Sequence, residues 1–253
     1  MIISIIQAQI FFLAFTRVMA VIIHIPMLGG NAIPNQVRIA LGFILTMVLI
    51  PWQPLPPETV ELGLFAFLAA ILREIIIGTL AGFAANLTFG AIQIAGEAMG
   101  LGSGFGSSRI FNPSMETSVS AYDQMFIMVA TLIFLVVNGH HFAIIALQRT
   151  FEAIPVNSAI EIGSVNTLIT MFSQLVAAGI QMALPVMAAL LLTDITLGLL
   201  ARVAPQIQVF FLGLPLKVAV SLVALGLLFS VIFPSLSNLF QQMGPRMVAL
   251  IQR

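Results

Sequence analysis

The sequence predicts an all-α membrane protein, and three observations support that fold class. Hydrophobic residues make up 60% of the 253 residues, and the mean hydropathy is +1.14. Charged residues make up only 7%, against about 25% in an ordinary soluble domain. Several predominantly apolar runs also reach the length of about 20 residues that a helix needs to cross a bilayer.

Charge and cysteine content exclude several functions. Nine Lys and Arg residues balance nine Asp and Glu residues, so the chain has no excess of basic charge for binding nucleic acid. Cysteine is absent, which excludes disulfides, thiolate metal sites and cysteine nucleophiles. One Trp and one Tyr are too few for the aromatic belts that normally mark both membrane interfaces. We therefore expect much of the apolar surface to face protein rather than lipid.

The first two helices are predicted from apolar runs that end at proline. Residues 2–25 are long enough to cross the ~30 Å hydrocarbon core, and Pro26 follows them. The run has no basic residue before Arg17, so we expect a retained helix rather than a cleaved signal peptide. A second, shorter helix is expected at residues 35–50, because a proline-rich segment begins at Pro51.

Four further helical segments flank the only long polar loop of the sequence. The apolar run at residues 60–89 is too long for one straight crossing, and a segment rich in small residues follows at 91–101. Glycine, serine, asparagine and proline then predict irregular backbone over residues 102–118. Helix is expected again at 119–137 and, after an Asn-Gly break, at 140–154.

The C-terminal third is predicted to contain two long helices and a tail. The helices are expected at 167–203 and 209–233, with Pro185 and Pro215 inside them, and a short amphipathic stretch follows Pro234. Runs of at least about 18 residues give five or six candidate spans. The distribution of Arg and Lys does not orient six conventional crossings consistently. Some helices are therefore expected to depart from simple spans.

We single out five of the charged residues that lie inside the predicted apolar helices. An isolated charge in hydrocarbon is costly, so each should meet an opposite charge or exposed carbonyl groups inside protein. Positions 73 and 74 diverge by about 100° on a helix, so each needs its own partner. We interpret these residues as structural charge pairs, and a proton or ion relay is the alternative. The five residues are Arg17, Arg73, Glu74, Glu97 and Asp194.

Glycines four residues apart predict flat helix faces. The pairs Gly78 and Gly82, and Gly96 and Gly100, have the spacing that lets another backbone approach closely. We assign these four glycines to packing against other subunits. Packing within the chain explains the same spacing equally well.

No motif indicates catalysis, a cofactor or a metal site. The segment Gly102-Ser103-Gly104-Phe105-Gly106 lacks the third glycine of a dinucleotide-binding turn at the right spacing, and no strand precedes it. His140 and His141 are adjacent, so one helix face cannot present both to a metal ion. The serines lack a nucleophile elbow and a base partner. We therefore expect a protein that is not an enzyme and needs no cofactor.

Short motifs follow one another in a specific order along the whole chain. The motifs are Pro26-Met27-Leu28-Gly29, Val37-Arg38, Arg73-Glu74 with Gly78 and Gly82, Gly96 to Gly100-Leu101, Phe111-Asn112-Pro113, Asn138-Gly139-His140-His141, and Pro205-Gln206-Ile207-Gln208-Val209-Phe210 through Gly213-Leu214-Pro215-Leu216. In this order they resemble the FliR family of flagellar biosynthesis proteins, whose relatives serve as the T component of virulence type III secretion. Asn112, where Asp is expected, and Gln208, where Asn is common, depart from the family pattern.

The resemblance implies a subunit of the flagellar type III export gate. In that family one copy joins FliP and FliQ subunits in a right-handed helical assembly, whose bore carries unfolded flagellar proteins. The implied fold is a set of bent helical hairpins within a single subunit at 1–253, in which residues 1–155 resemble FliP and residues 165–253 resemble a FliQ hairpin. FlhA and FlhB are further implied partners. The implied location is the bacterial inner membrane at the flagellar basal body.

The resemblance also implies that the loop at residues 102–118 is a plug that enters the pore and helps to hold it closed. Glycines permit backbone conformations that are closed to other residues, and apolar side chains supply bulk that excludes water. A solvated connector between helices is the alternative. The residues assigned to the plug are Gly102, Gly104, Phe105, Gly106, Ile110, Phe111, Asn112, Pro113 and Met115.

Two other classes of function have weaker support. A proton-coupled or small-solute transporter would use the intramembrane charges, but the sequence shows no inverted repeat. An intramembrane hydrolase needs a nucleophile with a base, and the sequence offers neither. Particle size separates a carrier from the export gate, because a carrier purifies as a monomer or a symmetric dimer.

Overall fold

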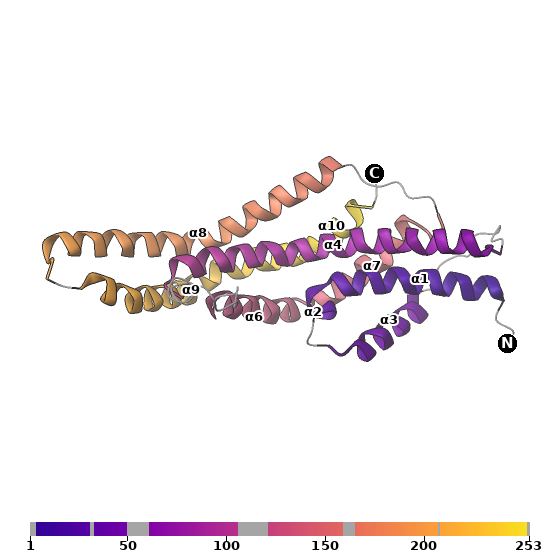
Figure 1. Cartoon of the computed structure of the whole chain (residues 1–253), viewed down its shortest axis with the longest axis horizontal. Helices are drawn as coiled ribbons and strands as arrows, with labels where there is room; N and C mark the ends of the chain where they lie inside the picture. Colours follow the sequence, from indigo (N-terminus) through magenta and orange to yellow (C-terminus); the bar gives the residue numbers. More distant parts are fainter. Residues whose placement is uncertain are drawn as a thin grey trace. The chain divides into compact units, whose positions relative to one another are not determined.

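The regular secondary structure of the described residues is entirely α-helical (Figure 1). The computed structural model describes residues 4–30, 33–49, 61–105, 121–158, 165–206 and 208–251. The helices are α1 (Ile5–His24), α2 (Pro26–Gly29), α3 (Asn35–Leu49), α4 (Leu64–Gly102), α6 (Ala121–Val136), α7 (Gly139–Ala153), α8 (Val165–Val203), α9 (Val209–Gln241) and α10 (Met243–Ala249).

The chain folds into two compact units, and each unit is assembled from separate parts of the sequence. The first unit contains residues 1–89, 138–172 and 240–253, and the second contains residues 90–137 and 173–239. Helices α4 and α8 therefore contribute to both units. The predicted division into residues 1–155 and 165–253 rests on family resemblance rather than on contacts, and it stays a prediction.

The first unit is built on α1. A capping box of Ser4 and Gln7 starts this helix. Phe11 and Phe15 of α1 pack against Phe43 of α3, with ring centroids 5.2 and 6.4 Å from it. Helix α10 packs on α7, where a Cβ on Gly244 would lie 3.4 Å from the Cβ of Ala146.

Close glycine contacts also position α4 in both units. In the first unit, a Cβ on Gly78 would lie 2.6 Å from the Cβ of Ala20, so α4 and α1 approach each other at the distance that only glycine allows. In the second unit, a Cβ on Gly179 of α8 would lie 2.6 Å from the carbonyl oxygen of Ala91. Helices α4 and α8 therefore lie at a short separation in the second unit.

Two helix boundaries differ from the sequence prediction. The segments predicted at 60–89 and 91–101 form the single helix α4, because packing overrides the helix penalty of about 1 kcal/mol that a glycine such as Gly90 carries. Pro234 does not end the last long helix, since α9 continues to Gln241. Proline removes one backbone donor, and a helix supported by packing tolerates that loss as a local defect.

Four of the described helices are long and apolar enough to cross a membrane, or five if α6 and α7 form one broken span. The sequence count of five or six therefore overlaps the structural count at five and exceeds it at six. Helices α4 and α8 each have 39 residues, which corresponds to about 58 Å at a 1.5 Å rise per residue. That length is nearly twice the ~30 Å hydrocarbon core. Parts of both helices must therefore lie outside a simple crossing.

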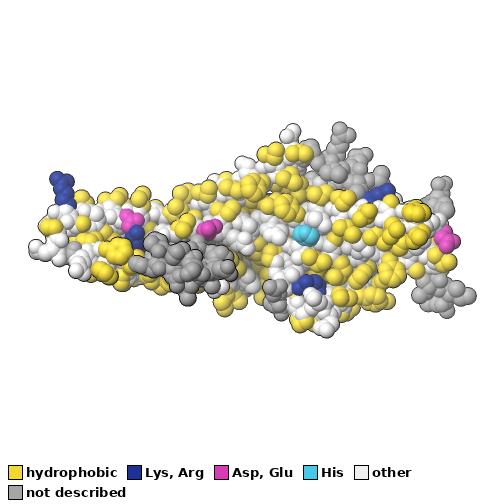
Figure 2. All heavy atoms as spheres, in the orientation of Figure 1, with side chains coloured by type: hydrophobic (Ala, Val, Ile, Leu, Met, Phe, Trp, Pro, Cys, Tyr) yellow, Lys and Arg dark blue, Asp and Glu magenta, His cyan; other side chains and the backbone are white. Residues whose placement is uncertain are grey.

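Apolar side chains cover much of the visible surface (Figure 2). Many large ones are more than half exposed, including Phe65 at 87%, Val203 at 82% and Leu227 at 75%. Charged groups are sparse on the same face. A surface of this composition needs lipid or other protein around it.

Candidate functional site: a buried ion pair and the base of a glycine-rich loop

Arg17 lies in the middle of α1 and is completely buried. Its Nε donates a hydrogen bond to Oε2 of Glu74 on α4, with an N–O distance of 2.5 Å, and Glu74 is also fully buried. The two side chains are 57 residues apart in the sequence. The ion pair joins α1 to α4 at the centre of the first unit, and each charge compensates the other away from water.

Arg17 also binds the C-terminal end of α7. Its Nη1 donates to the carbonyl oxygens of Thr150 at 3.0 Å and Ile154 at 2.6 Å. Both carbonyl groups lie at the C-terminal end of α7, which carries the negative partial charge of the helix dipole, so a guanidinium is favourable there. The Thr150 carbonyl also accepts the Ile154 N–H at 3.0 Å. The Arg17 Cζ lies 4.5 Å from the centre of the Phe151 ring, in cation–π range. One side chain therefore connects three helices.

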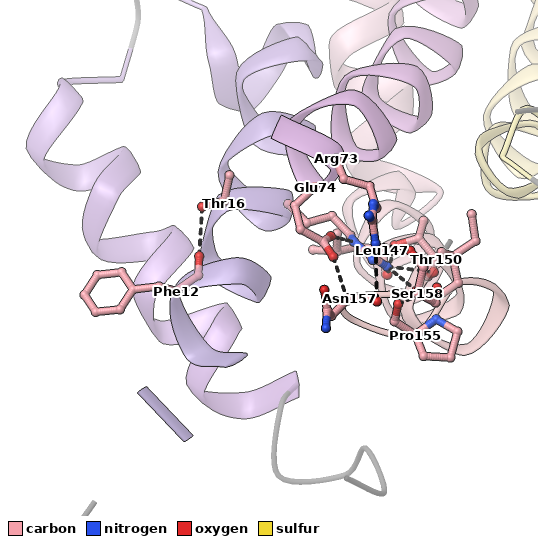
Figure 3. A network of polar contacts seen from close by, with 11 residues as sticks. Phe12, Thr16, Arg73, Glu74, Leu147, Thr150, Pro155, Asn157 and Ser158 are labelled. Atoms are coloured by element: carbon pink, nitrogen blue, oxygen red, sulfur yellow. Dashed lines mark hydrogen bonds and ion pairs between the residues drawn. The ribbon is translucent and has the colours of Figure 1, made fainter. Parts of the chain in front are cut away.

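Arg73 and Glu74 bind the turn that follows α7 (Figure 3). Glu74 Oε1 accepts the backbone N–H of Asn157 at 3.2 Å. Arg73 Nη1 donates to the carbonyl oxygen of Ser158 at 3.0 Å and to that of Asn157 at 3.4 Å. Asn157 has a left-handed backbone with φ of +66°, a conformation that asparagine adopts more easily than most residues. The adjacent charges thus fix one turn through different partners.

Asp194 and Glu97, the other two residues predicted to form structural charge pairs, lie in the second unit and do not pair with each other. Asp194 of α8 forms an ion pair with Lys217 of α9, with Nζ 2.5 Å from Oδ1. The two side chains are 48% and 24% exposed, respectively. Glu97 is exposed on α4 and has no ion pair with another described residue.

The loop assigned to the plug is described only at its base. Gly102 ends α4, and Ser103, Gly104 and Phe105 follow as a turn. Ser103 is fully buried, and its Oγ donates to the carbonyl oxygen of Gly100 at 2.8 Å. The other residues assigned to the plug lie outside the described residues: Gly106, Ile110, Phe111, Asn112, Pro113 and Met115.

Three of the four glycines assigned to subunit packing face helices of the same chain. Gly78 and Gly82 lie against α1, where added Cβ atoms would come within 2.7 Å of Ala20 or His24 side chains. Gly96 lies against α6, where an added Cβ would come within 3.4 Å of the Phe126 side chain. Gly100 is buried. These contacts lie within the chain, and the assignment of the four glycines to packing against other subunits stays a prediction.

Sequence reasoning missed Lys217 and the backbone partners of the two arginines. A signal for Lys217 was available, because Asp194 is the only acidic residue between positions 165 and 253. A lysine in an apolar helix of that segment therefore had one acidic candidate partner. No signal in the sequence identifies the carbonyl oxygens of Thr150, Ile154 and Ser158, because every residue has such a group.

The described residues contain no group of three or more His, Asp or Glu side chains arranged to hold a metal ion. The charged side chains at the centre of the first unit contact each other, helix-end carbonyls and a turn, and they stabilise the packing of apolar helices. These features define a helical membrane protein whose buried charges support its fold.

Comparison with known proteins identifies the family. The model of "Bacterial export proteins, family 1" matches residues 8–243. The flagellar biosynthetic protein FliR of Pectobacterium carotovorum is 32% identical over 92% of this chain and 88% of its own length. FliR of Aquifex aeolicus is 33% identical over 90% of this chain and 88% of its own length. FliR of Escherichia coli is 30% identical over 92% of this chain and 89% of its own length. The chain belongs to the FliR family of bacterial flagellar export proteins.

Proposed function

We propose that this chain is a non-enzymatic subunit of the flagellar type III export gate and forms part of the pore for unfolded flagellar proteins. The match to the FliR family over residues 8–243 is the observation that carries the proposal. The exposed apolar surface supports it, because a chain of this surface composition requires neighbours.

We infer that the neighbours are FliP-like and FliQ-like subunits in a right-handed helical hetero-oligomer, with FlhA and FlhB as further partners. Helices of 39 residues fit raised, bent hairpins better than simple membrane spans. In this proposal, residues 1–155 correspond to a FliP-like part and residues 165–253 to a FliQ-like hairpin. The assembly lies in the bacterial inner membrane at the flagellar basal body.

The loop at residues 102–118 is the proposed plug. Its described base leaves α4 through a buried serine and a glycine with a left-handed backbone, so the direction of the departing chain is fixed. Beyond the base, the sequence supplies apolar residues such as Ile110 and Phe111. A hydrophobic constriction can exclude water and close a pore to ions without a covalent barrier.

Deletion of residues 107–115 tests the pore and plug proposal. The deletion variant should still assemble with its co-expressed partners but should make the membrane permeable to small ions. A matched variant replaces the same nine positions with a Gly/Ser segment of equal length; it should leak as well, because the apolar side chains are absent. An assembled deletion variant with wild-type permeability and normal secretion would overturn the plug assignment.

The alternative of a proton-coupled transporter makes a different prediction for the buried charges. A relay needs groups that exchange protons along a path, whereas Glu74 is held by Arg17 and a backbone N–H. Glu74→Gln should therefore affect assembly and secretion together. A Glu74→Gln variant that assembles normally and loses only proton-driven transport would favour the transporter.

A further inference from the structure

We propose that the Asp194–Lys217 ion pair positions the base of the glycine-rich loop, so that the hairpin of α8 and α9 determines where the loop leaves the helices. This inference rests on the proposed plug function of the loop. All residues that carry it belong to the second unit.

The chain leaves α4 through a turn with little freedom. Ser103 Oγ donates to the carbonyl oxygen of Gly100 at 2.8 Å, and it accepts the backbone N–H of Phe105 at 3.4 Å. Gly104, which lies between Ser103 and Phe105, has a φ of +86°, a conformation that other residues adopt only with strain. The first residues of the loop therefore have one defined path.

That path runs directly over α9. A Cβ added to Gly104 would lie 3.4 Å from the carbonyl oxygen of Leu214 and 3.7 Å from the Cβ of Lys217. On the neighbouring side, a Cβ on Gly102 would lie 3.1 Å from Cδ1 of Leu190 on α8. The base of the loop is thus seated against both helices of the hairpin.

The first turn of α6, the next described helix in the sequence, lies against the same base. The ring of Phe105 lies 5.9 Å from the ring of Tyr122, in the first turn of α6, at an interplanar angle of 47°. Tyr122 is fully buried, and its hydroxyl contacts Met99 Sδ at 4.0 Å. The described base therefore packs against α6 as well as against α8 and α9.

Lys217 connects this base to the ion pair. The start of its side chain faces Gly104, while its Nζ is held by Asp194 on α8. The ion pair therefore joins α8 to α9, the two helices against which Gly102 and Gly104 are seated. The pair is partly exposed, so we expect its loss to raise the population of the undocked base about two- to fivefold rather than to abolish docking.

The test uses the absence of native cysteine. Ser103→Cys places one thiol at a fully buried position of the base, and its rate of maleimide labelling in the assembled complex reports how often the base opens. Adding Lys217→Met or Asp194→Asn should raise that rate about two- to fivefold. Combining Asp194→Lys with Lys217→Asp should restore it towards the parent value.

The matched control is Arg202→Met. Arg202 is an exposed cation near the end of α8, and no ion pair joins it to another described residue. The Arg202→Met substitution should leave the rate of maleimide labelling at Ser103→Cys unchanged. An unchanged rate in Lys217→Met, an equal rise in Arg202→Met, or failure of Lys217→Met to assemble would each overturn the positioning role.

Ion permeability then links the anchor to the plug. Lys217→Met should raise ion leakage in the full-length complex, yet it should add nothing when residues 107–115 are deleted. Additional leakage in the deletion background would overturn the proposal that Lys217 acts through the loop. Labelling responds to the anchor alone, so a deletion that fails to leak would contradict the plug without affecting the labelling result.

Discussion

Removing the Glu74 carboxylate is expected to destabilise the first unit much more than removing the neighbouring Arg73 guanidinium. Glu74→Ala leaves the guanidinium of Arg17 in a site with no exposure to solvent. Breaking a buried ion pair by removing one partner typically costs about 3–5 kcal/mol, because the remaining charge is uncompensated. The same substitution also removes the acceptor of the Asn157 N–H, so the turn after α7 loses one of its contacts.

Arg73→Ala should cost about 1 kcal/mol, since it removes hydrogen bonds of modest net value. Arg73 is only half-buried, and the Ser158 and Asn157 carbonyl groups that it binds include an exposed contact. Glu74→Ala should therefore cost more stability than Arg73→Ala because Glu74 is more deeply buried, although both residues are charged and adjacent.

A double variant separates the effect of the charge from the effect of packing. Arg17→Met with Glu74→Met removes both charges, and well-packed apolar replacements of a buried pair are often close to neutral. The Ile154 carbonyl still loses its Arg17 donor, which costs about 1–3 kcal/mol. The double variant should therefore be more stable than Glu74→Ala alone.

The assay is the loss of intact complex on heating in detergent, followed by size-exclusion chromatography. At about 2–4 °C per kcal/mol for a chain of this size, Glu74→Ala should lower the midpoint by about 6–20 °C and Arg73→Ala by about 2–4 °C. Equal shifts for the two single variants, or a double variant less stable than Glu74→Ala, would refute the argument from an uncompensated charge.

The same heating assay checks two contrasting glycines, and amide hydrogen exchange checks a hydrogen-bonded contact before α4. Gly78→Ala should cost about 1–3 kcal/mol, because the new Cβ would come within 2.7 Å of Arg17 O on α1; wild-type stability would contradict this close approach. Gly198→Ala should instead stabilise α8 by about 0.5–1 kcal/mol, since no atom lies within 4 Å of the added Cβ, and a loss of stability would show unsuspected contacts. Gln9→Leu removes both hydrogen bonds between Gln9 and the backbone of Leu62, so the Leu62 amide should exchange faster, and unchanged exchange would contradict its protection by Gln9.

The sequence predicted the helical class and the approximate positions of the longer helices, because apolar runs and proline breaks are local properties. It did not predict the short helix α2, which lies where the first helix was expected to end. It did not predict that α4 continues through Gly90, since the choice between a break and a continuous helix depends on packing. For the same reason, it placed the end of the last long helix at Pro234 rather than at Gln241.

The candidate site shows the same division between local and long-range information. A charge in an apolar helix can be recognised from composition, so Arg17 and Glu74 were singled out as residues that need partners. Their pairing across 57 residues depends on how α1 packs on α4. The helix-end carbonyls that bind Arg17 and the turn that binds Arg73 depend on backbone geometry, which residue types do not specify.

Co-expression and purification test the central claim that this chain works as one subunit of a hetero-oligomeric export gate. Expressed alone, it should be unstable or heterogeneous, because its exposed apolar helices lack neighbours. Expressed with FliP-like and FliQ-like proteins, it should purify as one large particle that contains all three, with the mass measured by native mass spectrometry. A stable, monodisperse monomer that does not associate with either protein would contradict the account.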